Sequence, residues 1–259
     1  MPSPREPNPL SPSPGVRGEE RARTAGTVAP PYLRVVRREG IRREAVREHW
    51  ARRALNIAVA LVGMAITAPL WIVIGALVKL TSRGPIFHTQ IRVGRDSRNT
   101  GFWKEDPRRR HDMGGRPFTI YKFRTMYVEA EQKTGAIWAT KDDPRVTVLG
   151  RFLRQYRLDE LPQLLNVVLG DMNIVGPRPE RPSIFETLRG SVQDYSLRQR
   201  ARPGITGLAQ VSQQYDSCLA DVQRKVEYDL EYIRRAGFWQ DLRIMVRTIP
   251  VILLRRGGW

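Results

Sequence analysis

The feature that most constrains this chain is an almost wholly apolar run from Ala54 to Leu80. A helix that crosses a bilayer needs about 20 predominantly apolar residues in succession, and this run is long enough to supply them. A core helix of a water-soluble protein is the alternative, but such helices are usually shorter and carry a polar face. The run therefore predicts a helix that is embedded in a membrane.

Two features of the run bear on how it sits in the bilayer. Pro69 lies near its middle and cannot donate a backbone hydrogen bond, so we expect a kink or a break there. Arginines crowd the N-terminal flank, and Lys79 and Arg83 follow the other end, whereas a spanning helix prefers its basic flank on one side only. This pattern favours a re-entrant helix-break-helix over residues 54–80. A kinked spanning helix is compatible with the same residues.

The segments on either side of the apolar run differ sharply in composition. Residues 1–31 are rich in Pro, Ser, Gly, Arg and Glu and have no hydrophobic period, which predicts disorder rather than a signal peptide. Residues 32–53 are dense in arginine and predict a basic juxtamembrane segment that lies against lipid headgroups. Residues 81–259 mix apolar and polar segments, so we expect one globular domain there.

Within this domain we expect a small β element among helices. A turn at Gly84-Pro85 leads into a strand that ends near Gly94, and the alternation over 118–124 predicts a second strand. The Arg-rich residues 95–115 between them predict a loop. The expected helices are residues 145–155, 162–169, 222–236 and 239–254. The last of these is basic and amphipathic with a Trp at its start, which is typical of a helix in the membrane interface, although packing against the domain core would give the same pattern. The predicted fold class is therefore α+β, mostly helical and membrane-associated.

Two adjacent carboxylates, Asp159 and Glu160, stand directly before Leu161-Pro162. Proline is favoured in the first turn of a helix, and Gly170 is a typical residue just after the last turn. The pair therefore falls at the N-terminus of the helix expected over 162–169, where the helix dipole favours anions. An acidic N-cap is the simplest interpretation of such a pair taken alone.

The basic residues around the pair point to chemistry beyond a cap. The chain has a net charge of +18, which implies an anionic partner. Three short basic motifs flank the pair: Lys122–Met126, Gly176–Glu180 and Ala201–Gly207. In the last two, Pro and Gly hold the backbone beside a single arginine, which suits bidentate binding of a phosphate or pyrophosphate. Nucleic-acid binding would instead need arginines interleaved with aromatic residues on one face, so no nucleic-acid partner is expected.

Four blocks of the sequence resemble, in order, the bacterial sugar transferase family, the monotopic polyprenyl-phosphate phosphoglycosyl transferases. The blocks are Tyr121–Met126, Leu158–Val167, Gly170–Glu180 and Arg202–Gly207, and the resemblance runs from about Ala51 to the C-terminus. It implies that the chain is an enzyme that transfers a sugar-1-phosphate from a UDP-sugar to undecaprenyl phosphate and releases UMP. This is the first membrane step in the assembly of exopolysaccharide, O-antigen, capsule or glycoprotein glycans.

The resemblance also implies roles for individual residues. Asp159 is the nucleophile that forms a covalent phosphosugar-aspartate, and Glu160 is the protein ligand of a Mg²⁺ ion. The residues expected to hold the substrate phosphates are Lys122, Arg178, Arg202 and, as a fourth, Arg124. Glu180 either supports the site by pairing with an arginine or forms a surface ion pair.

For the membrane segment, the resemblance implies a re-entrant helix-break-helix that leaves the enzyme on the cytoplasmic face of the bacterial inner membrane. Pro69 matches the break, but Ala68 stands where a serine is common, and Thr67 is the candidate to replace that serine's backbone hydrogen bond. The residues before Arg52 have no counterpart in the family, so we expect a form close to the minimal one.

Two alternatives to an active enzyme follow from the same residues. One is a family member that has lost activity and acts as a membrane-anchored scaffold, and the other is a protein that only binds an anionic ligand. An inactive member would be expected to lack one carboxylate of the pair, whereas both are present. The residues do not indicate which sugar is transferred, and they leave a homodimer through the globular domain open.

Overall fold

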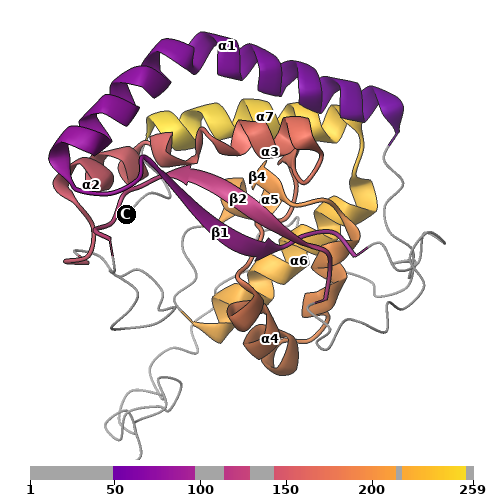
Figure 1. Ribbon diagram of the computed structural model, residues 1–259. Helices are drawn as coiled ribbons and strands as arrows, with labels where there is room; N and C mark the ends of the chain where they lie inside the picture. Colours follow the sequence, from indigo (N-terminus) through magenta and orange to yellow (C-terminus); the bar gives the residue numbers. More distant parts are fainter. Residues whose placement is uncertain (1–48, 97–113, 129–142, 214–217, 255–259) are drawn as a thin grey trace, which may run out of the picture. The chain divides into compact units, whose positions relative to one another are not determined.

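The computed structural model describes residues 49–96, 114–128, 143–213 and 218–254, and Figure 1 shows their arrangement. The predicted segment 1–31, most of 32–53 and most of the loop expected over 95–115 lie outside these residues. The helices are α1 (Trp50–Thr81), α2 (Val148–Gln155), α3 (Gln163–Leu169), α4 (Pro182–Ser191), α5 (Leu208–Ser212), α6 (Leu219–Arg235) and α7 (Phe238–Leu253), with 3₁₀ turns η2 (Leu158–Glu160) and η3 (Tyr195–Arg200). The strands are β1 (Phe87–Val93), β2 (Pro117–Phe123), β3 (Asn173–Val175) and β4 (Gly204–Thr206). The fold is α+β and mostly helical, as predicted.

Helix α1 contains the apolar run, and in the described part of the chain it is the one helix long and apolar enough to cross a membrane. A kink or a break was expected at Pro69. The chain stays helical through Pro69, so the break is wrong, and the helix bends along its length instead (Figure 1). A proline removes one backbone donor and crowds the preceding turn, which is enough to bend a helix without ending it. The Thr67 hydroxyl donates to the Gly63 carbonyl at 2.7 Å, the backbone bond expected from a hydroxyl near the proline.

Arginines fix the N-terminal end of α1 to the globular domain. The Arg52 guanidinium is buried, donates to the Asp241 carboxylate at 2.5 Å and also contacts the Tyr232 hydroxyl. Arg53 donates to the carbonyl groups of Val167 and Val168, at the end of α3. The expectation that residues 32–53 lie against lipid headgroups is thus wrong for these two arginines, because buried protein acceptors satisfy them instead.

The C-terminal end of α1 is fixed by Arg124, which follows β2. Its guanidinium donates to the Ser82 carbonyl at 2.7 Å and the Val78 carbonyl at 3.3 Å, and also contacts the carbonyl of Arg83. The last carbonyls of a helix have no partner within the helix, and a cation placed there satisfies them and interacts favourably with the helix dipole. Both ends of α1 are therefore attached to the same domain.

The two predicted strands, β1 and β2, pair antiparallel, with Phe87 opposite Phe123 and Val93 opposite Pro117. The end of β2 packs against the C-terminal half of α1 and against α2. The buried residues of this cluster are Ile74, Val78, Phe123 and Leu153. Trp71 of α1 meets Phe123 edge-on, with 5.8 Å between the ring centres. This core explains why the β element forms next to a membrane helix.

A second, parallel pair joins β3 to β4, with Asn173 opposite Gly204 and Val175 opposite Thr206. Each strand is only three residues long, which is too short to show a periodic pattern in the sequence. The pairing brings together two of the basic motifs, because Gly176 directly follows β3 and Ala201 precedes β4. The Gly204 N–H donates to the Pro177 carbonyl at 2.9 Å, so the two motifs lie against each other.

Helix α7 combines the two alternatives that its sequence left open. One face packs into the domain and buries Asp241 and Ile244. The other exposes a row of large apolar side chains, namely Trp239, Leu242, Val246, Ile249 and Leu253. Exposed apolar rows of this kind are typical of helices that lie in a membrane interface.

Candidate active site

The carboxylate pair occupies η2, at a sharp change in chain direction. Arg157, just before it, has the left-handed backbone conformation with φ of 56°, which is unusual for a residue other than glycine. Helix α3 then spans Gln163–Leu169 and is capped by Gly170, whose φ is 94°, close to the predicted helix over 162–169. Asp159 and Glu160 are only 7% and 6% exposed. Backbone strain of this kind clusters at functional sites because the surrounding structure has to maintain it.

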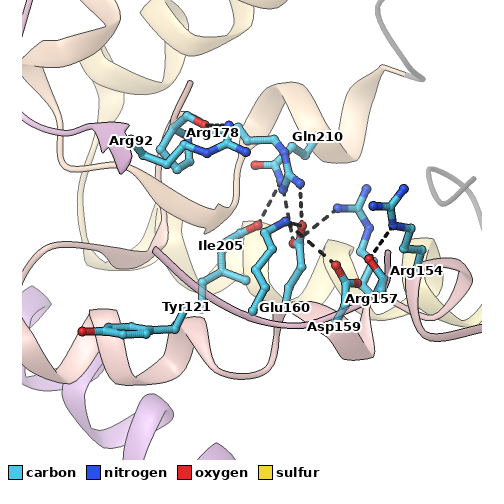
Figure 2. Close-up of polar contacts among 12 residues, drawn as sticks. Arg92, Tyr121, Arg154, Arg157, Asp159, Glu160, Arg178, Ile205 and Gln210 are labelled. Carbon is cyan, nitrogen blue, oxygen red and sulfur yellow. Dashed lines mark hydrogen bonds and ion pairs between the residues drawn. The ribbon is translucent and has the colours of Figure 1, made fainter. Parts of the chain in front are cut away.

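Cations from separate segments converge on Glu160 (Figure 2). Lys122 of β2 places its Nζ 2.8 Å from Oε1, and Arg178 approaches with Nη2 2.5 Å from Oε1 and Nη1 3.2 Å from Oε2. The Nη1 of Arg157 lies 3.8 Å from Oε2. The carboxylate therefore does not act as a helix cap, and its partners are side chains brought from other parts of the fold.

Asp159 has a different environment from its neighbour. Its Oδ2 lies 4.0 Å from the Lys122 Nζ, and it makes no hydrogen bond to any of the residues that the structure describes. The two members of the pair are thus distinguished: Glu160 is bound by cations, and Asp159 is buried beside them.

This difference sets the protonation behaviour of the pair. Burial raises the pKa of Asp159, the Glu160 charge raises it further, and Lys122 opposes both. Burial acts in the same direction on Glu160, but Arg178 and Lys122 together hold the pKa of Glu160 well below its usual value. Burial also lowers the pKa of Lys122, against the attraction of the two carboxylates. Asp159 is therefore the more basic carboxylate, and Glu160 is the more firmly anionic one.

The loop that carries Arg178 is held from behind by two other arginines. Arg198 donates to the Arg178 carbonyl at 3.1 Å, and Arg92 of β1 donates to the Pro179 carbonyl at 3.0 Å. Arg198 is itself fully buried in an ion pair with Asp229 of α6, with 2.6 Å between Nε and Oδ2. These bonds fix the backbone from which the Arg178 side chain reaches Glu160.

Glu180 lies behind the site and faces α6. Its Oε1 is 2.9 Å from the Lys225 Nζ and 3.9 Å from the Arg198 Nη1. Burial alone would raise the pKa of Glu180, but Lys225 and Arg198 lower it to about 2. The sequence left two roles open for Glu180: pairing with an arginine in support of the site, or a surface ion pair. The structure agrees better with the first role, although the nearest cation is Lys225 and not an arginine.

The structure brings some predicted phosphate-binding residues to the pair and leaves others elsewhere. Lys122 and Arg178 both contact Glu160. The backbone of Arg202 lies beside the Arg178 motif, because any side-chain carbon on Gly176 would fall 2.3 Å from the Arg202 carbonyl. Arg124 lies elsewhere: its guanidinium donates to carbonyl groups at the end of α1 and not to the carboxylate pair.

Sequence reasoning missed two arginines beside the pair, Arg154 and Arg157. Arg154, on the last turn of α2, donates to the Thr125 hydroxyl at 2.9 Å, and its charge lowers the pKa of Asp159 (Figure 2). The available signal was a row of arginines at every third position, Arg151, Arg154 and Arg157, immediately before the pair. A solvated helix face was the more ordinary interpretation of that row.

The donor set fits the Mg²⁺ ion implied by the family resemblance. The described residues contain no group of three or more His, Cys, Asp or Glu side chains that could enclose a metal by themselves. Mg²⁺ needs no such enclosure, since it is commonly held by one or two carboxylates together with substrate phosphates. Two consecutive buried carboxylates supply that number of ligands, and the ion would have to displace Lys122 or Arg178 from the Glu160 oxygens.

Comparison with known proteins gives consistent matches. The family model described as Bacterial sugar transferase matches residues 47–105 and 107–255. The chain is 40% identical over 200 residues to the UDP-glucose:undecaprenyl-phosphate glucose-1-phosphate transferase of Klebsiella pneumoniae, covering 76% of this chain and 39% of that protein. It is 37% identical over 207 residues to the UDP-N-acetylgalactosamine-undecaprenyl-phosphate N-acetylgalactosaminephosphotransferase of Aeromonas hydrophila, covering 80% and 44%. It is 34% identical over 223 residues to the exopolysaccharide production protein ExoY of Sinorhizobium fredii, covering 81% and 88%.

The chain spans less than half the length of the first two relatives and most of the third. The family match nevertheless covers α1, the carboxylate pair and the basic motifs that meet around it. On this evidence the chain belongs to the bacterial sugar transferase family.

Proposed function

We propose that this protein transfers a sugar-1-phosphate from a UDP-sugar to a polyprenyl phosphate such as undecaprenyl phosphate, with release of UMP. The observation that carries the proposal is the division of the buried pair: Glu160 is hydrogen-bonded by Lys122 and Arg178, whereas Asp159 has the Lys122 Nζ at 4.0 Å. A carboxylate nucleophile needs basicity, which favours Asp159 over Glu160. The names of the relatives support the substrate classes, since they are UDP-sugar and undecaprenyl-phosphate transferases.

In the first step, an Asp159 oxygen attacks the β-phosphorus of the UDP-sugar. A bond forms between that oxygen and phosphorus, and the bond from phosphorus to the oxygen of UMP breaks. In the second step, a phosphate oxygen of the polyprenyl phosphate attacks the same phosphorus and Asp159 leaves as a carboxylate. The reaction is thereby divided into two displacements at one phosphorus, each easier than a direct transfer.

Charge neutralisation is the main task of the other residues, because an anionic nucleophile has to approach an anionic pyrophosphate. Lys122 and Arg178 supply positive charge at the pair, and the rigid loops of Arg178 and Arg202 suit binding of the phosphates. Glu160 would hold Mg²⁺, which when bound would stabilise the negative charge of the phosphates.

The attachment of α1 supports a location on one face of the membrane. The helix has 32 residues, which corresponds to about 48 Å, whereas the hydrocarbon core of a bilayer is about 30 Å thick. Arg52 fixes one end to the globular domain and Arg124 fixes the other, while Leu164 of α3 contacts the helix at Gly63. A helix that crossed the bilayer would separate its two ends, so this geometry favours the re-entrant arrangement.

In this arrangement the domain lies on the cytoplasmic face of the bacterial inner membrane, where UDP-sugars are made. Single cysteines at positions 38 and 97, which lie outside the described residues, provide the test. Membrane-impermeant labelling in inverted and right-side-out vesicles should place both on the cytoplasmic side. Labelling from opposite sides would contradict the re-entrant arrangement and indicate a spanning helix.

The activity itself is tested by assaying UMP release from a panel of UDP-sugars with and without polyprenyl phosphate. We expect one or more donors to give UMP together with a polyprenyl-diphosphate-sugar, the starting lipid for an exopolysaccharide, O-antigen, capsule or glycoprotein glycan. Binding of UDP-sugars without turnover of any of them would instead favour the inactive scaffold or the anionic-ligand binding protein.

A further inference from the structure

A cavity of about 220 Å³ borders Glu160, on the side of α5 and α7. Most of the side chains that line it are apolar, and they come from three segments that are distant in sequence. These apolar side chains include Leu158, Leu161, Leu164, Ile205, Val211, Val251 and Ile252. A cavity of this composition suits a hydrocarbon better than a nucleotide or a sugar, because neither of those could satisfy its polar groups there.

The same cavity has a charged part. Glu160 and Arg157 are both among its lining residues, and the Arg157 Nη1 is 3.8 Å from Glu160. The left-handed backbone of Arg157 places this cation between η2 and the end of α2. An apolar cavity with a cation beside the reacting groups matches a ligand that joins a phosphate to a hydrocarbon chain.

Two other cations contact Glu160 away from the cavity. Lys122 and Arg178 contact Glu160 but do not line the cavity. Figure 2 shows Arg178 and Arg92 on one side of Glu160, and Arg154 and Arg157 on the other. Arg157 is therefore the cation that borders the cavity, whereas Arg178 lies on the other side of Glu160.

The cavity is also continuous with the apolar surface of the molecule. Helix α7 contributes Val251 and Ile252 to the cavity, and Ile252 is 36% exposed, so the cavity reaches the surface beside this helix. Leu164, which lines the cavity, contacts the apolar helix α1 at Gly63. A hydrocarbon chain that leaves the cavity would therefore meet the two helices of this domain with exposed apolar faces.

We infer that this cavity binds the isoprene units of the polyprenyl phosphate next to its phosphate, and that Arg157 holds that phosphate. The inference rests on the proposed function and assigns a separate site to the acceptor lipid. With the lipid so placed, its phosphate oxygen faces the phosphorus carried by Asp159. The P–O bond to the lipid phosphate forms, the P–O bond to Asp159 breaks, and the aspartate is released as a carboxylate.

The test uses a variant at each end of the site, each with a matched control. Val251→Phe fills the cavity, and Ile249→Phe makes the same kind of change on the exposed face of α7. Arg157→Gln removes the cation, and Arg151→Gln removes an exposed arginine from the same row. For each full-length variant in lipid nanodiscs, KM is measured separately for undecaprenyl phosphate and for the UDP-sugar that the wild type accepts.

We expect Val251→Phe and Arg157→Gln to raise KM for undecaprenyl phosphate tenfold or more, and to leave KM for the UDP-sugar within twofold. Both control variants should keep both constants. An unchanged lipid KM in Val251→Phe, or a raised UDP-sugar KM in Arg157→Gln, would overturn the inference. A wild type that forms no lipid product with any UDP-sugar would contradict the proposed function instead.

A second measurement does not depend on the stability of the variants. A polyprenyl phosphate with a diazirine in its first isoprene unit is photolysed with the wild-type protein, and the labelled peptides are identified by mass spectrometry. Labels in α5, β4 or the Thr248–Ile252 part of α7 support the cavity as the site. Labels confined to other segments would overturn it.

Discussion

The side chain of Asn166 connects α3 to β2, and replacing it by alanine should destabilise the protein measurably. Its Nδ2 donates to the Thr119 carbonyl at 2.7 Å, and its Oδ1 accepts from the Tyr121 N–H at 3.1 Å. Asn166 therefore bonds to β2 as a neighbouring strand would, and β2 carries Lys122 to the carboxylate pair. Because Asn166 is fully buried, water cannot replace these bonds without a rearrangement.

The loss can be estimated from the two bonds. Each contributes about 1 kcal/mol, and a buried N–H left without a partner costs about 1–3 kcal/mol more, so Asn166→Ala should lose about 2–4 kcal/mol. For a domain of this size that corresponds to a fall in Tm of about 5–15 °C. The activity should also fall, because β2 would no longer hold Lys122 firmly against Glu160.

Thermal unfolding followed by circular dichroism in one detergent checks this estimate. Leu169→Ala is the matched control, since Leu169 lies on the same helix and is exposed. Its Tm should stay close to that of the wild type. If Asn166→Ala melts within about 2 °C of Leu169→Ala, the bonds between α3 and β2 do not stabilise the site as argued.

Three further predictions concern features around the site. Gly150→Ala should destabilise the protein strongly, because the alanine Cβ would lie 2.1 Å from the Thr125 carbonyl oxygen. Gly190→Ala is the control and should be tolerated, since nothing lies within 4 Å of its Cβ position. Equal melting temperatures for the two variants would refute this prediction. Arg124→Met should lower Tm by removing the cap of α1 while leaving KM for the UDP-sugar within twofold, and a large rise in that KM would return Arg124 to the phosphate site. Because the pKa of Glu180 is about 2 in the folded protein, against an ordinary 4.5, its charge stabilises the fold by about 3 kcal/mol above pH 4.5, and this contribution is lost as the pH falls toward 2. Lys225→Met raises that pKa, so acid unfolding should begin at a higher pH, and an unchanged acid midpoint would contradict the assignment.

The parts of the fold that were predictable from sequence are those fixed by neighbouring residues. Pro162 and Gly170 set the limits of α3, and the alternation of aromatic and β-branched residues identified β2. The apolar run identified α1. In each case the signal lies within the element, so no knowledge of its partners was needed.

The parts that were missed depend on which distant segments meet. Strands β3 and β4 are too short for a period and exist because they pair with each other across the fold. Arg52 and Arg124 belong to basic stretches that suggested headgroups and phosphates, but each finds acceptors in the protein: a carboxylate for Arg52 and helix carbonyls for Arg124. The charge of an arginine does not show whether it binds a lipid, a substrate phosphate or a protein acceptor, because that depends on which acceptor lies nearest in the fold.

The candidate site shows the same division. Asp159, Glu160, Lys122 and Arg178 were expected from their motifs, and the structure brings them together. The sequence could not show that the two carboxylates have opposite environments. That difference arises from three segments that place their cations on Glu160, and it is the reason for proposing Asp159 as the nucleophile.

The central claim is that Asp159 forms a bond to phosphorus, and a single-turnover experiment tests it most directly. Enzyme in excess is mixed with UDP-sugar in the absence of polyprenyl phosphate, and both UMP and the mass of the peptide that contains Asp159 are measured. The wild type, and Asp171→Asn as a matched control, should release UMP and carry a phosphosugar on that peptide. Asp159→Asn should do neither, and UMP release at the wild-type rate in Asp159→Asn would contradict the account.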